Sequence, residues 1–150
     1  MLVPFNRALF GVVLVLMVAG LSAVSVRAAG VEGLSQAQVS ALEQRVRERW
    51  QAKIDKDFGR VWEFSTPTFR EVFPKSLYIH KFSYEIDWEL TSVEVVNYDA
   101  DAAVASVAVG VMSQSTKHAS SASKAVGAVP VTIREKWVFA DGEWWHSVNY

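Results

Sequence analysis

Glu135 and His146, near the C-terminal end, are the residues whose types and spacing best suit acid–base chemistry. They flank Asp141-Gly142, a strong signal for a two-residue β-hairpin turn. In that hairpin register Trp137 lies opposite His146, and Glu135 projects from the same, largely apolar face. If the face is concave, Glu135 is a candidate general base and His146 a candidate acid or hydrogen-bond donor. Alternatively, the two side chains only satisfy each other's hydrogen-bonding groups at the rim of a pocket.

Tyr84 and Asp87 are weaker candidates, because only their residue types and their place before a strand favour them. The alternative is that Tyr84 is a half-buried phenol and Asp87 a carboxylate at a strand edge, both without a catalytic role.

Metal binding has little support, since the three histidines are far apart and have no partner at metal-ligand spacing: His80, His118 and His146. The chain has no cysteine and no glycine-rich phosphate loop, so we expect neither a metal nor a cofactor.

The hairpin register also sorts the aromatic side chains onto two faces. The face of Glu135 carries the residues expected to line a ligand pocket, with one tryptophan added from an earlier strand: Ile133, Trp137, Phe139, Trp144 and Trp88. The opposite face carries Val138 and Trp145, where a sheet-to-sheet dimer contact would need an apolar anchor.

A long amphipathic helix is predicted to begin after Ser35, which forms a capping box with Gln38. One apolar face recurs at spacings of three and four: Val39, Leu42, Val46, Trp50 and Ile54. Five basic residues form a stripe beside this face: Arg45, Arg49, Lys53, Lys56 and Arg60. Their aliphatic side-chain carbons are expected to pack along the edge of the core, with the charged groups in water. Asp57 is predicted to cap a second short helix, which ends before Pro67. Pro74 is predicted to start a third short helix.

After residue 85 the apolar period changes to two and predicts four strands, at 85–98, 102–112, 129–139 and 143–148. The serine-rich segment 113–128 is expected to be a mobile, exposed loop. Helices followed by an antiparallel meander indicate an α+β fold in which N-terminal helices pack on a curved antiparallel sheet.

Residues 1–28 have the charged start, apolar stretch and small-residue end of a secretory signal, with cleavage expected after Ala28. The alternative is an uncleaved membrane anchor through residues 8–26. Although 51% of the whole chain is hydrophobic, residues 29–150 have an ordinary composition and a net charge of −3. We therefore expect a single periplasmic or secreted domain at 29–150 that does not bind nucleic acid.

Three segments resemble the nuclear-transport-factor-2-like superfamily, most closely its small exported bacterial, SnoaL-like members: RWQAKIDKDF at 49–58, STPTFR at 65–70 and EKWVFADGEWW at 135–145. The resemblance implies a cone-shaped, cystatin-like α+β roll with a pocket between helices and sheet. It also implies a homodimer formed through the sheet. Because members of this superfamily include both enzymes and non-catalytic modules, the resemblance leaves activity open.

The function expected from the sequence is that of an exported, non-catalytic domain that binds a small apolar ligand or a protein partner. The alternative is an isomerase or dehydratase that uses acid–base residues in the pocket. No assembled catalytic set is evident, so we favour binding over catalysis.

Overall fold

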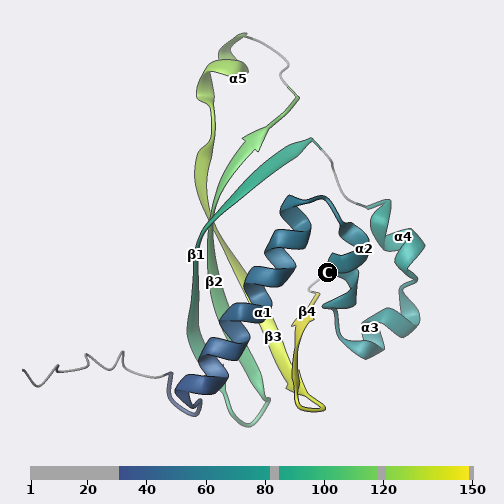
Figure 1. Cartoon of the computed structure of the whole chain (residues 1–150), viewed down its shortest axis with the longest axis vertical. Helices are drawn as coiled ribbons and strands as arrows, with labels where there is room; N and C mark the ends of the chain where they lie inside the picture. Colours follow the sequence, from purple (N-terminus) through teal and green to yellow (C-terminus); the bar gives the residue numbers. More distant parts are fainter. Residues whose placement is uncertain (1–30, 82–84, 118–120, 149–150) are drawn as a thin grey trace, which may run out of the picture.

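The structure is a computed structural model that describes residues 31–81, 85–117 and 121–148, without the side chains of 122–124. The predicted signal or anchor at 1–28 therefore lies outside the described residues, as does Tyr84. The described chain contains helices followed by an antiparallel sheet, which confirms the predicted α+β class (Figure 1).

The helices lie together on one side of the sheet, apart from one at its tip (Figure 1). Their bounds are α1 Gln36–Ile54, α2 Phe58–Glu63, α3 Pro67–Val72, α4 Lys75–Ile79 and α5 Ser121–Val126. The predicted capping box of Ser35 and Gln38 is present, and Asp57 caps α2. Pro67 does not simply end the preceding helix: it occupies the first turn of α3, whose N-cap is Thr66. Proline fits there because the first turn needs no amide donor.

The sheet has four antiparallel strands in the order β1-β2-β3-β4. Their bounds are β1 Ile86–Asp99, β2 Val104–Ser115, β3 Val129–Ala140 and β4 Glu143–Ser147. The hairpin register is the predicted one, with Ala140 opposite Glu143 and Trp137 opposite His146. Asp141 and Gly142 both have positive φ, at 55° and 80°, as a two-residue turn between twisted strands requires.

The inner face of the sheet packs against α1 and forms the main core. In β2 the buried residues alternate strictly: Ala105, Val107, Val109 and Val111. Leu42, Val46 and Trp50 of α1 pack in the same cluster. A smaller cluster joins α1, α2 and α4 through Ala52, Phe58, Val61 and Tyr78.

The segment predicted as one long loop at 113–128 differs in the structure. β2 continues to Ser115, because residues 86–88 of β1 still pair with it, and Ser121–Val126 forms α5. β1, β2 and β3 extend past the end of α1 and carry α5 at their tip (Figure 1).

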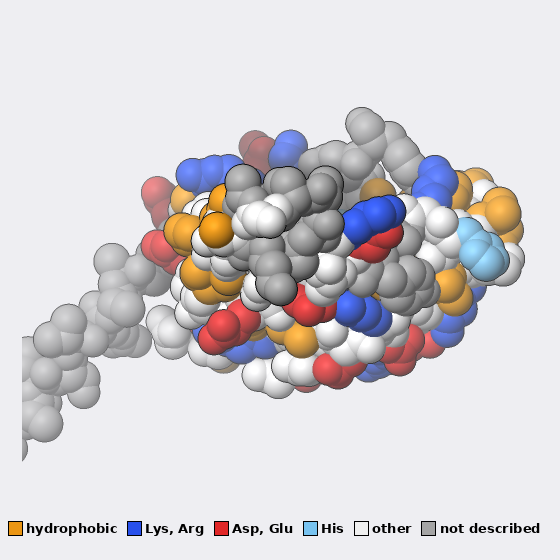
Figure 2. Space-filling model, turned by 90° about the horizontal axis from the view of Figure 1, so that it is seen from above, with side chains coloured by type: hydrophobic (Ala, Val, Ile, Leu, Met, Phe, Trp, Pro, Cys, Tyr) orange, Lys and Arg blue, Asp and Glu red, His pale blue; other side chains and the backbone are white. Residues whose placement is uncertain are grey.

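Within the described ranges, no helix is long and apolar enough to span a bilayer. Among the described side chains visible from the tip of the sheet, basic and acidic residues are interspersed (Figure 2).

Candidate functional site

Glu135 is the centre of a polar cluster buried between α1 and the sheet. Its Oε1 accepts hydrogen bonds from Arg49 Nη1 at 2.7 Å and Trp50 Nε1 at 3.0 Å. Its Oε2 accepts one from Trp137 Nε1 at 3.0 Å. The side chain is on the inner face, as the hairpin register predicted, and the residue is 6% exposed. Both carboxylate oxygens are therefore already engaged by donors of the protein itself.

Arg49 is the member of this cluster that sequence reasoning missed. The basic stripe was expected to keep its charges in water, yet Arg49 is 6% exposed and its guanidinium contacts Glu135. The reason is the rotation of α1, which turns adjacent residues Arg49 and Trp50 together toward β3. A buried guanidinium needs a carboxylate, because an unpaired buried charge costs several kcal/mol. The inward position of Glu135 was the signal that could have identified this partner.

His146 is the second predicted residue that the structure brings to this cluster. Its Nε2 lies 3.9 Å from Glu135 Oε1, and its ring contacts Trp137 edge to face. Its backbone N–H donates to Phe64 O at 2.8 Å, so the end of α2 holds β4 in place. Burial lowers the pKa of His146 well below its usual value, and the positive charges of Arg49 and Lys53 lower it further. The imidazole is therefore neutral at pH 7.

Lys53 lies one helical turn beyond Arg49, at the border of the cluster. Its Nζ is 4.1 Å from the centre of the Trp50 ring and 4.7 Å from that of Trp88. Burial lowers the pKa of Lys53 to about 8; the charge of Arg49 adds to this effect, and that of Glu135 opposes it. An ammonium between two indole rings is stabilised by cation–π attraction.

The arrangement limits what Glu135 can do chemically. A general base must lie within reach of the substrate proton, and Glu135 is only 6% exposed. Here both oxygens are hydrogen-bonded, one of them to a charged donor, so accepting a proton would weaken the contacts that join α1 to β3.

The structure does not bring the other acid–base candidate that it describes into the cluster. Asp87 is exposed on β1 and pairs with Lys56 at 2.8 Å. His80 is exposed at the end of α4. Among the described residues, no group of three histidine, aspartate or glutamate side chains is placed to hold a metal ion.

The predicted pocket residues all pack in or against the main core. Trp137 and Trp144 are buried within it, and the others are partly buried against it: Trp88, Ile133 and Phe139. Trp88 contacts Trp50 edge to face, which brings β1 to the polar cluster.

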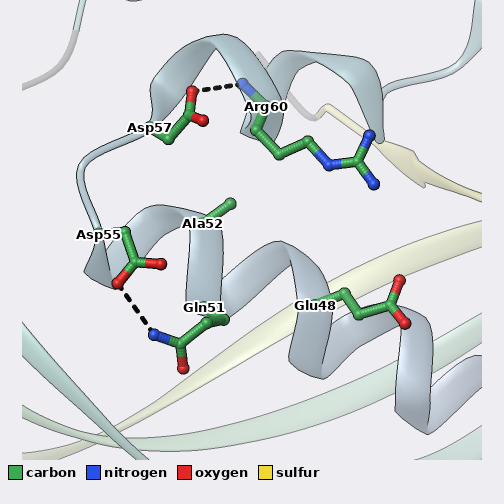
Figure 3. A pocket seen from close by; sticks show the side chains of 6 residues that line it. All are labelled: Glu48, Gln51, Ala52, Asp55, Asp57 and Arg60. Atoms are coloured by element: carbon green, nitrogen blue, oxygen red, sulfur yellow. Dashed lines mark hydrogen bonds between the residues drawn. The ribbon is translucent and has the colours of Figure 1, made fainter.

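A cavity of about 350 Å³ lies elsewhere, between α1 and α2 (Figure 3). Most of its lining residues have polar or charged side chains: Glu48, Gln51, Asp55, Asp57 and Arg60, together with Ala52. Two of the carboxylates are already used, since Asp55 accepts from Gln51 and Asp57 caps α2. This lining does not suit the apolar ligand expected from the sequence.

The two predicted interface residues have different surroundings. Val138 lines a cavity of about 330 Å³ on the outer face of the sheet, beside Ser106 and Lys136. The Trp145 ring instead packs within the chain, because the guanidinium carbons of Arg45 and Arg70 each lie 5.0 Å from its centre. The role of Val138 and Trp145 in an interface stays a prediction.

No family model and no curated protein matches this chain. Among solved structures, it is similar to RPA3114, a SEC-C motif containing protein from Rhodopseudomonas palustris, with a TM-score of 0.43 and 16% identity over 73% of this chain and 77% of that one. It is also similar to Aln2 from a Streptomyces species, with a TM-score of 0.46 and 12% identity over 76% of this chain and 89% of that one.

These neighbours are a SEC-C motif protein and Aln2, not nuclear-transport-factor-2-like or SnoaL-like proteins, so the predicted family is wrong. The segments behind that prediction contribute helix ends, a hairpin turn and core aromatics, which many α+β folds need.

Glu135→Gln is expected to destabilise the protein by about 3 kcal/mol, because it leaves the buried charge of Arg49 unpaired. Urea unfolding measures this loss. Exposed Glu71→Gln is the matched control and should change stability by less than about 0.5 kcal/mol. The double variant Arg49→Met/Glu135→Gln should cost less than the sum of the single variants. Additive costs would show that the two side chains are not coupled.

Acid is expected to destabilise the fold through His146. Its folded pKa lies below the unfolded value near 6.5, so the unfolded chain binds the proton more tightly. Stability due to the neutral ring is complete above about pH 7.5 and falls as the pH drops through 6.5. Between pH 7.5 and 5.5 the loss should be about 1 kcal/mol in wild type and smaller in His146→Gln. Equal losses in urea unfolding would contradict this assignment.

Proposed function

We propose that this chain is an exported, non-catalytic domain that binds a small apolar ligand on the inner face of its sheet. The observation that carries the proposal is an apolar surface on that face beyond the polar cluster. Val131 and Val129 precede Glu135 at alternate positions of β3 and share its face, but they are 38% and 41% exposed. The rest of this face forms the core, so exposed valines on it offer an apolar surface that a ligand can bury.

The neighbouring strands continue these inner-face rows, in which Val111 is already buried while Leu90 and Trp88 are partly exposed. Leu90, Val111 and Val131 form one row across β1, β2 and β3. Trp88, Ser113 and Val129 form the next row outward. This part of the sheet extends beyond α1 (Figure 1). On this proposal the ligand lies against the part of the sheet that extends beyond α1, and a signal segment at 1–28 precedes the domain.

The second candidate function is an isomerase or dehydratase that uses Glu135 and His146. The observation that favours it is their 3.9 Å approach inside the buried cluster. It requires a substrate to reach Glu135, which is 6% exposed, and protonation of this carboxylate would weaken its hydrogen bonds to α1, whereas binding requires no change in the cluster. We therefore place binding first.

We infer a second surface, for a second copy of this chain, from the order of charges on the outer face. β1 presents Glu89, Glu94 and Asp99 there, and β3 presents Arg134 and Lys136. β2 lies between them with mostly small side chains: Val104, Ser106, Ala108 and Gly110.

Glu94 and Arg134 lie in one row on either side of Ala108, with backbones two strand spacings or roughly 10 Å apart, and the structure shows no ion pair between them. A two-fold axis along β2, between two stacked sheets, places β1 of one copy over β3 of the other. Glu94 then faces Arg134 of the second copy, and the small side chains of β2 allow close approach.

Ligand binding is expected for a neutral apolar probe. 1-Decanol should bind the wild-type protein in isothermal titration calorimetry, and Val131→Asp should weaken binding about tenfold or more because it places a charge on the apolar face. Thr132→Asp is the matched control, since Thr132 lies one position along on the outer face, opposite Gly110. Absence of decanol binding, or equal weakening in both variants, would refute the proposal. A chemically altered probe recovered after incubation would favour the enzyme.

Dimerisation through the outer face predicts charge-reversal rescue. Glu94→Arg and Arg134→Glu should each give monomers at tens of micromolar, because each places like charges opposite one another, and the double variant should restore the dimer. Native mass spectrometry measures the oligomeric state, and a monomeric wild-type protein would contradict the proposed dimer.

Cleavage of the signal segment is tested on protein recovered from the periplasm. The mass of the protein identifies its first residue, which is expected to be Ala29. A chain that still begins at Met1 would contradict signal cleavage.

A further inference from the structure

Lys53 has no carboxylate partner in the described part of the chain. Its ammonium contacts only the Trp50 and Trp88 rings there. The nearby carboxylate of Glu135 is already engaged by Arg49, Trp50 and Trp137. A half-buried ammonium without a counter-ion is costly, and cation–π contacts recover only part of the lost hydration.

The cluster as a whole carries one positive charge too many. Arg49 and Lys53 are cationic, Glu135 is anionic and His146 is neutral. A single negative group beside Lys53 would balance this charge. A monoanion fits the surplus better than a phosphate dianion does, and one ammonium lacks the forked donors that favour phosphate.

The position of Lys53 relative to the apolar surface defines the rest of such a ligand. The Trp88 ring contacts the ammonium, and Trp88 also lies in the inner-face row of Ser113 and Val129. A chain that starts at Lys53 therefore passes directly onto apolar side chains. We propose that Lys53 binds the carboxylate of an amphiphilic ligand, a free long-chain carboxylic acid, whose hydrocarbon part lies on the inner face near Val129 and Val131.

This inference rests on the proposed function, because it names the ligand class of the same face. The test compares probes that share one chain and differ in the head group: decanoate, 1-decanol and decyltrimethylammonium, with acetate as the head group alone. Isothermal titration calorimetry at pH 7 should give binding about tenfold tighter for decanoate than for decanol. Decyltrimethylammonium should bind more weakly than decanol, and acetate should bind more weakly than decanoate.

Variants assign the preference to Lys53. Lys53→Met keeps the length and apolar stem of the side chain, so it should retain decanol binding and lose the preference for decanoate. Lys53→Arg keeps the charge and should retain the preference. The control is Arg47→Met, which removes an exposed cation from the same helix and should change neither affinity.

The pH dependence gives a second readout. The charged groups that face Lys53 are Arg49 from α1 and Glu135 from β3, and His146 of β4 lies beside them. Because His146 is neutral above pH 7, Lys53 is the member of this set that changes charge between pH 7 and pH 10. Its pKa is about 8 in the free protein, so decanoate affinity should fall over this range in wild type and stay constant in Lys53→Arg.

The outcomes separate the two proposals. If decanol and decanoate bind equally, or if Lys53→Met keeps the preference, the assignment of Lys53 is wrong and the apolar binding face stands. If no decyl probe binds, both proposals fail. If acetate binds as tightly as decanoate, the site takes a small anion and the apolar surface plays no part.

Discussion

The contact between Arg49 and Glu135 is the constraint on which the arrangement of α1 and the sheet depends. One carboxylate accepts hydrogen bonds from Arg49 and Trp50 of the helix and from Trp137 of its own strand. These bonds set the rotation of α1 about its axis, because any other rotation would leave a buried charge without a partner. The apolar contacts of α1 are less directional and tolerate small rotations more readily. The rotation in turn places Lys53, four residues after Arg49, against Trp88 of β1.

The same contact determines which groups remain for function. Glu135 is the residue that its type and its inward position mark as a base, but its oxygens are used in holding the fold together. His146 is kept neutral by burial and by the two neighbouring cations. The polar group at the border of the apolar face is therefore the Lys53 ammonium, which on our proposal binds an anionic head group without transferring a proton. Binding follows more directly from this arrangement than catalysis does.

Features that depend on local chemistry could be predicted from the sequence. The Ser35 capping box, the Asp57 cap and the hairpin register at Asp141-Gly142 each involve residues a few positions apart. The pairing of Arg49 with Glu135 joins residues 86 positions apart and depends on the rotation of a helix, which periodicity does not determine. The same applies to Trp145, whose ring is covered by arginines from α1 and α3. The predicted family failed for a related reason, because caps and turns recur in unrelated folds.

Two irregularities in β1 keep the two faces of the sheet distinct. The register shifts between Leu90 and Ser92 and again between Val95 and Asn97. Each extra residue resets the alternation, so apolar side chains stay inward and Glu94 stays outward along a strand of 14 residues. Without the first shift, Val93 would point outward and Glu94 into the core. The apolar side chains of β1 therefore stay on the inner face, beside Lys53. The outer face keeps its acidic residues on β1 and its basic residues on β3. Ligand and second copy would then occupy opposite faces, and neither would exclude the other.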